Sequence, residues 1–223
     1  MYLIELSDYC LNPIGTGNGL NNSYFALSSG DACSMQTDST DDAHIFLKAL
    51  ATLVRPVSGT YRFTGKTIDF SDYRELLPFK KKIGYIGQDS AMISNRTVRE
   101  NLLLMRFYFE NSVSISLDEN VLKFLKLFDL EDKLDLRPGE LRPVDLRTAI
   151  AIRELTKSFD VLLLDRPEHY FGFKSFYIFN EILENTLEAG HAVVFFSRDR
   201  SFIETFSNRK ILIAGGTLTK VPL

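Results

Sequence analysis

Cysteine, histidine and long apolar runs are all scarce in this sequence, and each scarcity excludes a class of protein. The only two cysteines, Cys10 and Cys33, cannot build a disulfide framework, so we expect free thiols in a reducing compartment. The three histidines, His44, His169 and His191, lie far apart and lack the spacing of a metal-ligand motif, so we predict no metal site. No apolar run reaches the roughly 18 residues that a membrane-spanning helix needs.

Positive charge is also in short supply. The formal net charge is −3, which gives no basic field for nucleic acid, and we expect no nucleic-acid partner. The segment 1–6 lacks the basic start and apolar centre of a signal peptide. These features predict a cytoplasmic protein that reaches a membrane only through a partner.

What the sequence does contain is an alternation of strand and helix patterns. Strands are predicted in 1–35, 58–63, 82–88, 161–165 and 192–197, with a final hairpin through Gly215-Gly216. Helices are predicted in 98–109, 117–128, 146–155 and 175–187, with Asp145 capping the third. A further helix, with Ile45, Phe46, Leu50 and Leu53 on one face, follows an acidic loop at 37–42. The alternation predicts an α/β fold, a parallel sheet with helices on both faces.

The run Val161-Leu162-Leu163-Leu164-Asp165 is typical of a buried strand that ends in a carboxylate. Open α/β sheets bind their ligands at this edge. A nucleotide hydrolase would carry a second acid at the next position, to polarise the attacking water. Arg166 stands there instead, and its charge is the opposite one.

Five segments at suitable spacing together carry a family resemblance. They are Leu47–Leu53, Ser58-Gly59-Thr60 with Gly65-Lys66, Ile83–Asp89, Arg96–Asn101 and Leu162–Asp165. Taken in order, they resemble the nucleotide-binding domain of ABC transporters over nearly the whole chain. The resemblance implies a P-loop NTPase-like parallel sheet core with an antiparallel β subdomain and a helical subdomain. It implies a single domain, 1–223, in which 1–90 and 146–223 form the core and β subdomain, and about 91–145 the helical subdomain.

The phosphate-binding loop of that family is degenerate here. The resemblance places its glycines at 37, 40 and 42, its lysine at 43 and its magnesium-binding hydroxyl at 44. This chain has Thr37, Thr40, Asp42, Ala43 and His44. Without glycines, consecutive backbone N–H groups cannot wrap phosphates. The residue that would stack on adenine falls near Asn12 or Pro13, and neither is aromatic.

Carboxylates take the place of the missing groups. Asp38, Asp41 and Asp42 lie where a polyanion would bind, and like charges about 4 Å apart repel by several kcal/mol at a partly buried site. The departures from the family pattern therefore predict that ATP and magnesium do not bind in the usual pose. We hypothesise that Arg166 and Arg198 pair with these acids and replace the nucleotide. Alternatively, the two arginines bind an anionic ligand, or Asp165 still holds a metal.

The other motifs have changed as well. The signature motif aligns at Leu141-Arg142-Pro143-Val144-Asp145, where Pro143 removes an N–H group and Val144 adds bulk. A second register, Leu136–Glu140, keeps one glycine. The switch histidine aligns at Arg198, and the segment after Asp165 becomes His169-Tyr170-Phe171-Gly172. Only Gln88 and Asp165 keep side chains of the family's type, so we predict no catalytic residue.

An aromatic stretch near the end of the 98–109 helix has two readings. It contains Met105, Phe107, Tyr108 and Phe109. These residues are either the core of the helical subdomain or the groove that receives a cytoplasmic helix of a permease, which is the role the resemblance implies.

The sequence thus predicts a pseudo-ATPase, a non-hydrolysing ABC-type subunit with a structural or regulatory role. The resemblance implies a membrane permease and a second, intact ABC ATPase as partners, in a hetero- or homodimer, and a place at the inner or plasma membrane. One alternative is an atypical but working ATPase that binds ATP and magnesium and uses Gln88 and Asp165. Another is a soluble interaction or sensor module that uses the sealed site.

Overall fold

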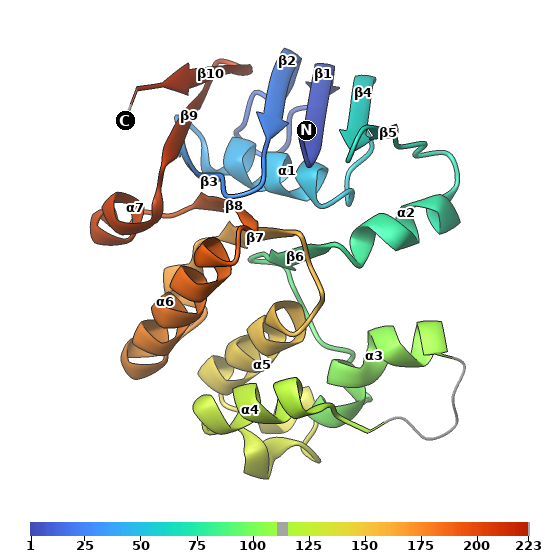
Figure 1. Ribbon diagram of the computed structural model, residues 1–223, viewed down its shortest axis with the longest axis vertical. Helices are drawn as coiled ribbons and strands as arrows, with labels where there is room; N and C mark the ends of the chain where they lie inside the picture. Colours follow the sequence, from blue (N-terminus) through green and yellow to red (C-terminus); the bar gives the residue numbers. More distant parts are fainter. Residues whose placement is uncertain (111–115, 223) are drawn as a thin grey trace. The chain divides into compact units, whose positions relative to one another are not determined.

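A computed structural model describes residues 1–110 and 116–222, except the side chain of Phe109 (Figure 1). These residues form two compact units. The first unit contains 1–87, 158–167 and 183–223; the second contains 88–157 and 168–182. Among the described residues, none of the helices combines the length and the apolar character that a membrane span requires.

The first unit contains an antiparallel sheet with the strand order β2-β1-β4-β5. Its strands are β1 (Ile4–Leu11), β2 (Leu20–Leu27), β4 (Ser58–Phe63) and β5 (Lys66–Thr67). The glycine-rich segment 12–19 connects β1 to β2. Bulges interrupt the pairing of β1 with both of its neighbours.

A second sheet in the same unit has the order β10-β9-β3-β8-β7-β6. Its strands are β3 (Ala32–Thr37), β6 (Ile83–Ile86), β7 (Val161–Asp165), β8 (Ala192–Phe196), β9 (Arg209–Ala214) and β10 (Thr217–Val221). All pairs are parallel except the β9–β10 hairpin at the edge. The strands β6, β7 and β8 are buried throughout, which is why they read as continuous apolar runs. The predicted α/β fold with a parallel sheet is therefore confirmed.

Helix α1 (Thr40–Leu50) packs on β3, β7 and β8 (Figure 1). Its Phe46 meets Phe25 of β2 edge to face, with ring centroids 5.2 Å apart. Two expectations about this segment are wrong. The acidic loop ends at Ser39 rather than at residue 42, because acidic residues are favourable in the first turn of a helix. The helix also stops at Leu50, which leaves Leu53 51% exposed.

Two short helices were not predicted from the sequence. Helix α2 (Tyr73–Lys80) contains Pro78 and buries only Leu76, so it lacks a clear apolar face. Helix α7 (Arg200–Phe206) has seven residues, too few to show a period. Both begin after an aspartate that accepts a backbone N–H, and this capping signal was visible in the sequence.

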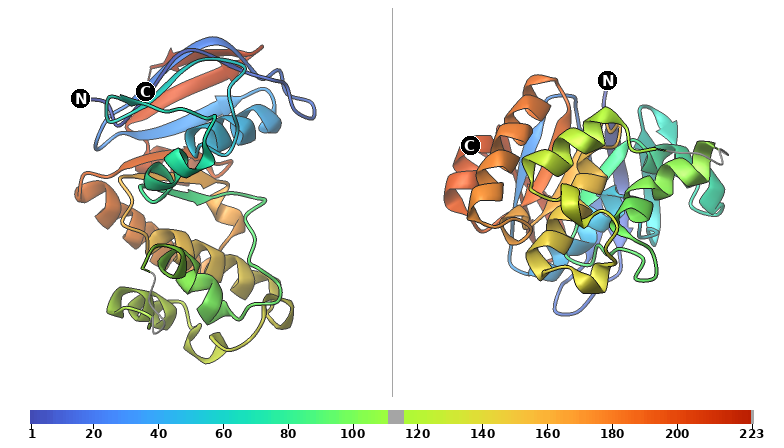
Figure 2. Two further views of the ribbon diagram at one scale, coloured as in Figure 1. Left: turned by 90° about the vertical axis from the view of Figure 1, so that its right-hand side faces the viewer. Right: turned by 90° about the horizontal axis from the view of Figure 1, so that it is seen from below.

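The second unit is helical (Figure 2). Its helices are α3 (Val98–Glu110), α4 (Glu119–Leu127), α5 (Pro143–Leu155) and the first part of α6 (Phe173–Glu188). The predicted start of α5 at Leu146 is wrong, because Pro143 occupies the first turn with a pre-set φ angle. Asp145 is not the cap; it lies inside the first turn.

The described residues also contain three short 3-10 turns. They are η1 (Glu131–Lys133), η2 (Pro138–Glu140) and η3 (Pro167–His169).

Candidate functional site

The start of α1 is the first place to look for a site, because it follows the C-terminal end of the central strand β3. Ser39 is the N-cap residue, but its side chain makes no capping hydrogen bond. Two aspartates occupy the first turn instead, half-buried Asp41 and fully buried Asp42. The groups that these carboxylates contact decide what the helix start can bind.

Both carboxylates bind the backbone of the β1–β2 loop. Oδ1 of Asp42 accepts the N–H groups of Asn18 and Gly19 at 2.8 and 2.9 Å. Oδ2 of Asp41 accepts the N–H and the hydroxyl of Thr16 at 2.7 and 3.0 Å. The Thr16 donors lower the pKa of the Asp41 carboxyl below its ordinary value. The buried Oδ2 of Asp42 has no hydrogen-bond partner among the described residues, so this side chain depends on the two loop N–H groups.

Glycines make this close approach possible. A Cβ added at Gly15 would lie 2.3 Å from Oδ2 of Asp41, and one at Gly17 would lie 2.4 Å from Oδ1 of Asp42. Gly15 also has a φ of +51°, which favours glycine. The loop is therefore in direct contact with both acids, and a larger residue at either glycine would separate them.

Behind this contact, His44 of α1 meets Asp165 at the end of β7. The distance from His44 Nδ1 to Asp165 Oδ2 is 2.6 Å, and the Asp165 side chain is completely buried. This pair was not predicted, because we assigned no role to His44.

The remaining positions of the degenerate loop make contacts within the protein. Ala43 is buried, and the Thr37 hydroxyl donates to the Ser39 carbonyl at 2.8 Å. Arg198 Nη2 donates to the Thr40 hydroxyl at 3.0 Å.

One pairing stays a prediction, namely the ion pairs of Arg166 and Arg198 with Asp38, Asp41 and Asp42. The partners that the structure gives to Asp41 and Asp42 are loop donors.

Arg166 has an unusual backbone. Its φ is +58°, in the left-handed region that few residues other than glycine adopt, and its N–H donates to the Phe196 carbonyl at 2.8 Å. The parallel pairing of β7 with β8 thus continues one residue past Asp165. Gln88 begins the second unit and is exposed.

In the second unit, the signature positions form the start of α5. Arg142 donates to both oxygens of Asp145, at 2.8 and 2.9 Å, and Lys133 Nζ lies 3.3 Å from Oδ2 of the same carboxylate. Arg142, and then Lys133, lower the pKa of Asp145. In the other register, 136–140, the Glu140 carboxylate turns back to accept the Arg137 N–H at 2.6 Å. The acids of both candidate signature segments thus accept hydrogen bonds from groups within the second unit.

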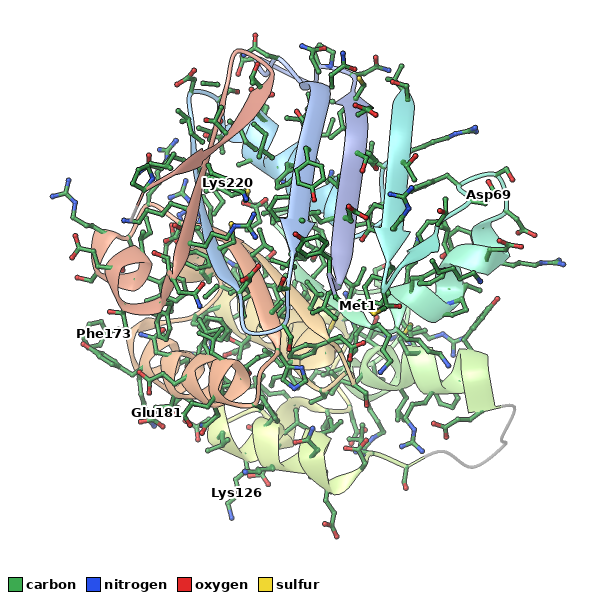
Figure 3. All side chains as sticks on the ribbon, turned by 45° about the horizontal axis from the view of Figure 1, so that its top comes forward. Met1, Asp69, Lys126, Phe173, Glu181 and Lys220 are labelled. Carbon is green, nitrogen blue, oxygen red and sulfur yellow. The ribbon has the colours of Figure 1, made fainter. Side chains whose placement is uncertain are left out.

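The segment after Asp165 is built into an aromatic row. Phe171 stacks on Phe128 and on Phe179, with centroids 5.5 and 4.6 Å apart, and Tyr170 is also buried. The neighbouring Phe173 is 82% exposed and projects outward at the start of α6 (Figure 3).

The aromatic residues proposed for permease docking lie at the end of α3. Phe107 is 44% and Tyr108 63% exposed, while Met105 is half-buried. Phe109 belongs to the helix, but its side chain lies outside the described part. The exposure favours the surface reading over the core reading for Phe107 and Tyr108, and docking itself stays a prediction.

Several known proteins are similar to this chain. The macrolide export ATP-binding/permease protein MacB of Campylobacter jejuni is 28% identical over 198 residues, which is 88% of this chain and 31% of that protein. The sulfoquinovosyl glycerol transport ATP-binding protein SmoE of Agrobacterium fabrum is 26% identical over 77% of this chain and 48% of its own length. The chain therefore spans 31% to 48% of the length of these relatives.

Solved structures share the fold. The dimeric structure of the bacterial ABC transporter cassette MJ0796 has a TM-score of 0.82 at 22% identity, with 99% of both chains covered. A post-hydrolysis form of that cassette, bound to ADP and Pi, has a TM-score of 0.81 at 21% identity, with the same coverage. The fold is that of an ABC ATPase cassette.

The family model described as ABC transporter matches residues 45–169, more than half of the chain. The match begins directly after the degenerate loop positions 37–44. On this match, the chain belongs to the ABC transporter family.

Proposed function

We propose that this chain is a non-hydrolysing ABC-type subunit, a pseudo-ATPase with a structural or regulatory role in a transporter complex. In this proposal, residues 1–223 act as one nucleotide-binding-type domain whose helical part is about 91–145. No residue is assigned to catalysis, and no nucleotide or magnesium is required.

The contact between His44 and Asp165 carries the proposal. Magnesium would need a hydroxyl at position 44 facing the Asp165 carboxylate. A ring nitrogen 2.6 Å from that carboxylate takes the place of both the hydroxyl and the ion. The residues around it do not fit a triphosphate either, because position 43 carries a buried methyl group and position 42 a buried carboxylate. The site therefore offers Mg-ATP neither a hydroxyl ligand for the metal nor a lysine charge for the phosphates.

Partners of two kinds follow from the family. One relative is named an ATP-binding/permease protein, and the MJ0796 cassette has a dimeric structure. We propose a membrane permease and a second ABC ATPase subunit as partners, in a hetero- or homodimer. The exposed Phe107 and Tyr108 of α3, with Met105, are the proposed permease contact, and the permease would hold the chain at the membrane.

A second candidate is an atypical ATPase that binds ATP and magnesium. The post-hydrolysis cassette bound to ADP and Pi, which shares the fold, favours it. In this case Gln88 and Asp165 would keep their family roles, and His44 would have to move away from the carboxylate.

Calorimetric titration with Mg-ATP, combined with an assay of phosphate release, separates the two. The proposal predicts no saturable binding below millimolar nucleotide and the same phosphate release for wild type and Asp165→Asn. Micromolar binding, or phosphate release that Asp165→Asn abolishes, would establish the second candidate. Recovery of a permease and an intact ABC ATPase with the tagged chain would support the partners, and recovery of the chain alone would refute them.

A further inference from the structure

We infer that the β1–β2 loop, residues 14–19, is a built-in ligand of the former phosphate site and keeps that site closed at any nucleotide concentration. This inference rests on the proposed function only in taking the start of α1 as the former phosphate site. It adds a regulatory property, because the occupant belongs to the chain itself.

The first argument is the inverted polarity of the contact. In a phosphate-binding loop, backbone N–H groups of the loop before the helix point outward at an anion. Here the anions are Asp41 and Asp42 of the helix, and the donors are the N–H groups of Thr16, Asn18 and Gly19. The loop therefore presents to α1 the kind of donor array that the helix start would otherwise present to a nucleotide.

The second argument is the shape of the loop. A turn closed by the Gly17 N–H and the Ile14 carbonyl, at 2.8 Å, points its backbone at the two acids. Gly15 and Gly17 leave no room for even a methyl group between the loop and the carboxylates. A triphosphate could reach the helix start only after the loop had left.

The third argument is that the loop is anchored at both of its ends. On one side, Leu11 of β1 pairs with Leu20 of β2. On the other side, the Asn21 N–H donates to the Gly216 carbonyl at 2.8 Å. A tethered group has a high effective concentration at its site, so no soluble ligand at ordinary concentration displaces it easily.

Matched glycine variants test the inference by hydrogen exchange. Gly17→Ala pushes a methyl group against Asp42, whereas Gly139→Ala, also at an ordinary φ, has open space around it. The inference predicts that the Asn18 and Gly19 amides exchange at least about tenfold faster in Gly17→Ala, and at the wild-type rate in Gly139→Ala. A second pair repeats the test at positive φ, because Gly15→Ala clashes with Asp41 while Gly215→Ala meets nothing.

Asp42→Ala serves if a glycine variant fails to fold. It removes the acceptor and should release the Asn18 and Gly19 amides, and Gly17→Ala added to it should have little further effect. Equal exchange in Gly17→Ala and Gly139→Ala, or unprotected Asn18 and Gly19 amides in the wild type, would overturn the inference. Micromolar Mg-ATP binding alongside slow amide exchange would instead overturn the proposed function and the closure of the site together, and would leave only the loop contact standing.

Discussion

Two helix starts in this protein provide partners for their first-turn carboxylates in different ways. Helices α1 and α5 both carry aspartates in the first turn. At α1, Asp41 and Asp42 accept hydrogen bonds from loop donors, chiefly backbone N–H groups, although Oδ2 of Asp42 has no partner among the described residues. At α5, Asp145 is satisfied by the cationic side chains of Arg142 and Lys133.

This difference shows which property each of the two contacts depends on. Neutral N–H donors bring no net charge, so the α1 contact depends on backbone shape and on glycine. Cationic side chains act through charge, so the α5 contact tolerates changes in shape but weakens in salt. Variants at the two helix starts should therefore differ in how much stability they lose and in how strongly that loss depends on salt.

The largest effect is expected at His44→Ala, which takes a buried contact from Asp165. Because a buried carboxylate that loses a hydrogen-bond partner is costly, the free energy of unfolding should fall by about 3 kcal/mol. Chemical denaturation measures the change, with the exposed His169→Ala as the matched control, expected within about 0.5 kcal/mol of wild type. An equal effect of the two variants would refute a stabilising role for the His44–Asp165 contact.

A smaller loss is expected from Asp42→Ala. The variant leaves the Asn18 and Gly19 N–H groups without their acceptor, which should cost about 2 kcal/mol. Because those donors are uncharged, unfolding in low and high salt should give the same difference from wild type. A loss that vanishes in high salt would mean that cationic side chains, and not the loop, satisfy this acid.

At the other helix start, Arg142→Ala should cost under about 1 kcal/mol, because Arg142 is 72% exposed and Lys133 remains beside Asp145. The difference from wild type should disappear near 1 M salt, where screening acts within roughly 3 Å. Paired denaturation curves at low and high salt measure it. A cost larger than that of Asp42→Ala would reverse the comparison between α1 and α5.

The smallest effect concerns pH. The Thr16 donors lower the pKa of Asp41 below its ordinary value of 3.8, so the unfolded chain takes up this proton at a higher pH than the folded chain. The stabilising contribution of Asp41 is therefore complete above about pH 4 and is lost as the pH falls through the folded pKa. The Thr16 amide chemical shift, followed by NMR, should titrate with a midpoint below 3.8. A midpoint above that value would show that the contact does not form in solution.

Much of the fold could be read from the sequence, because apolar runs such as Val161–Leu164 and turns such as Gly215-Gly216 reflect local physics. The element boundaries at Thr40 and Pro143 were misplaced, since capping and first-turn preferences shift a helix start by a few residues.

The site was harder to predict than the fold. The acids at the start of α1 were visible in the sequence, but their partners were not, because an N–H donor leaves no trace in residue identity. The same limit applies to the pair of His44 with Asp165, which lie 121 positions apart and meet only through the order of strands in the sheet.

The most direct test asks whether the chain's own loop or a nucleotide occupies the start of α1. Amide NMR spectra of the protein with and without millimolar Mg-ATP would follow the Thr16, Asn18 and Gly19 signals. The account predicts slow exchange at these amides and no shift change on adding Mg-ATP. Saturable shifts at the three amides, with faster exchange as the loop leaves, would contradict it.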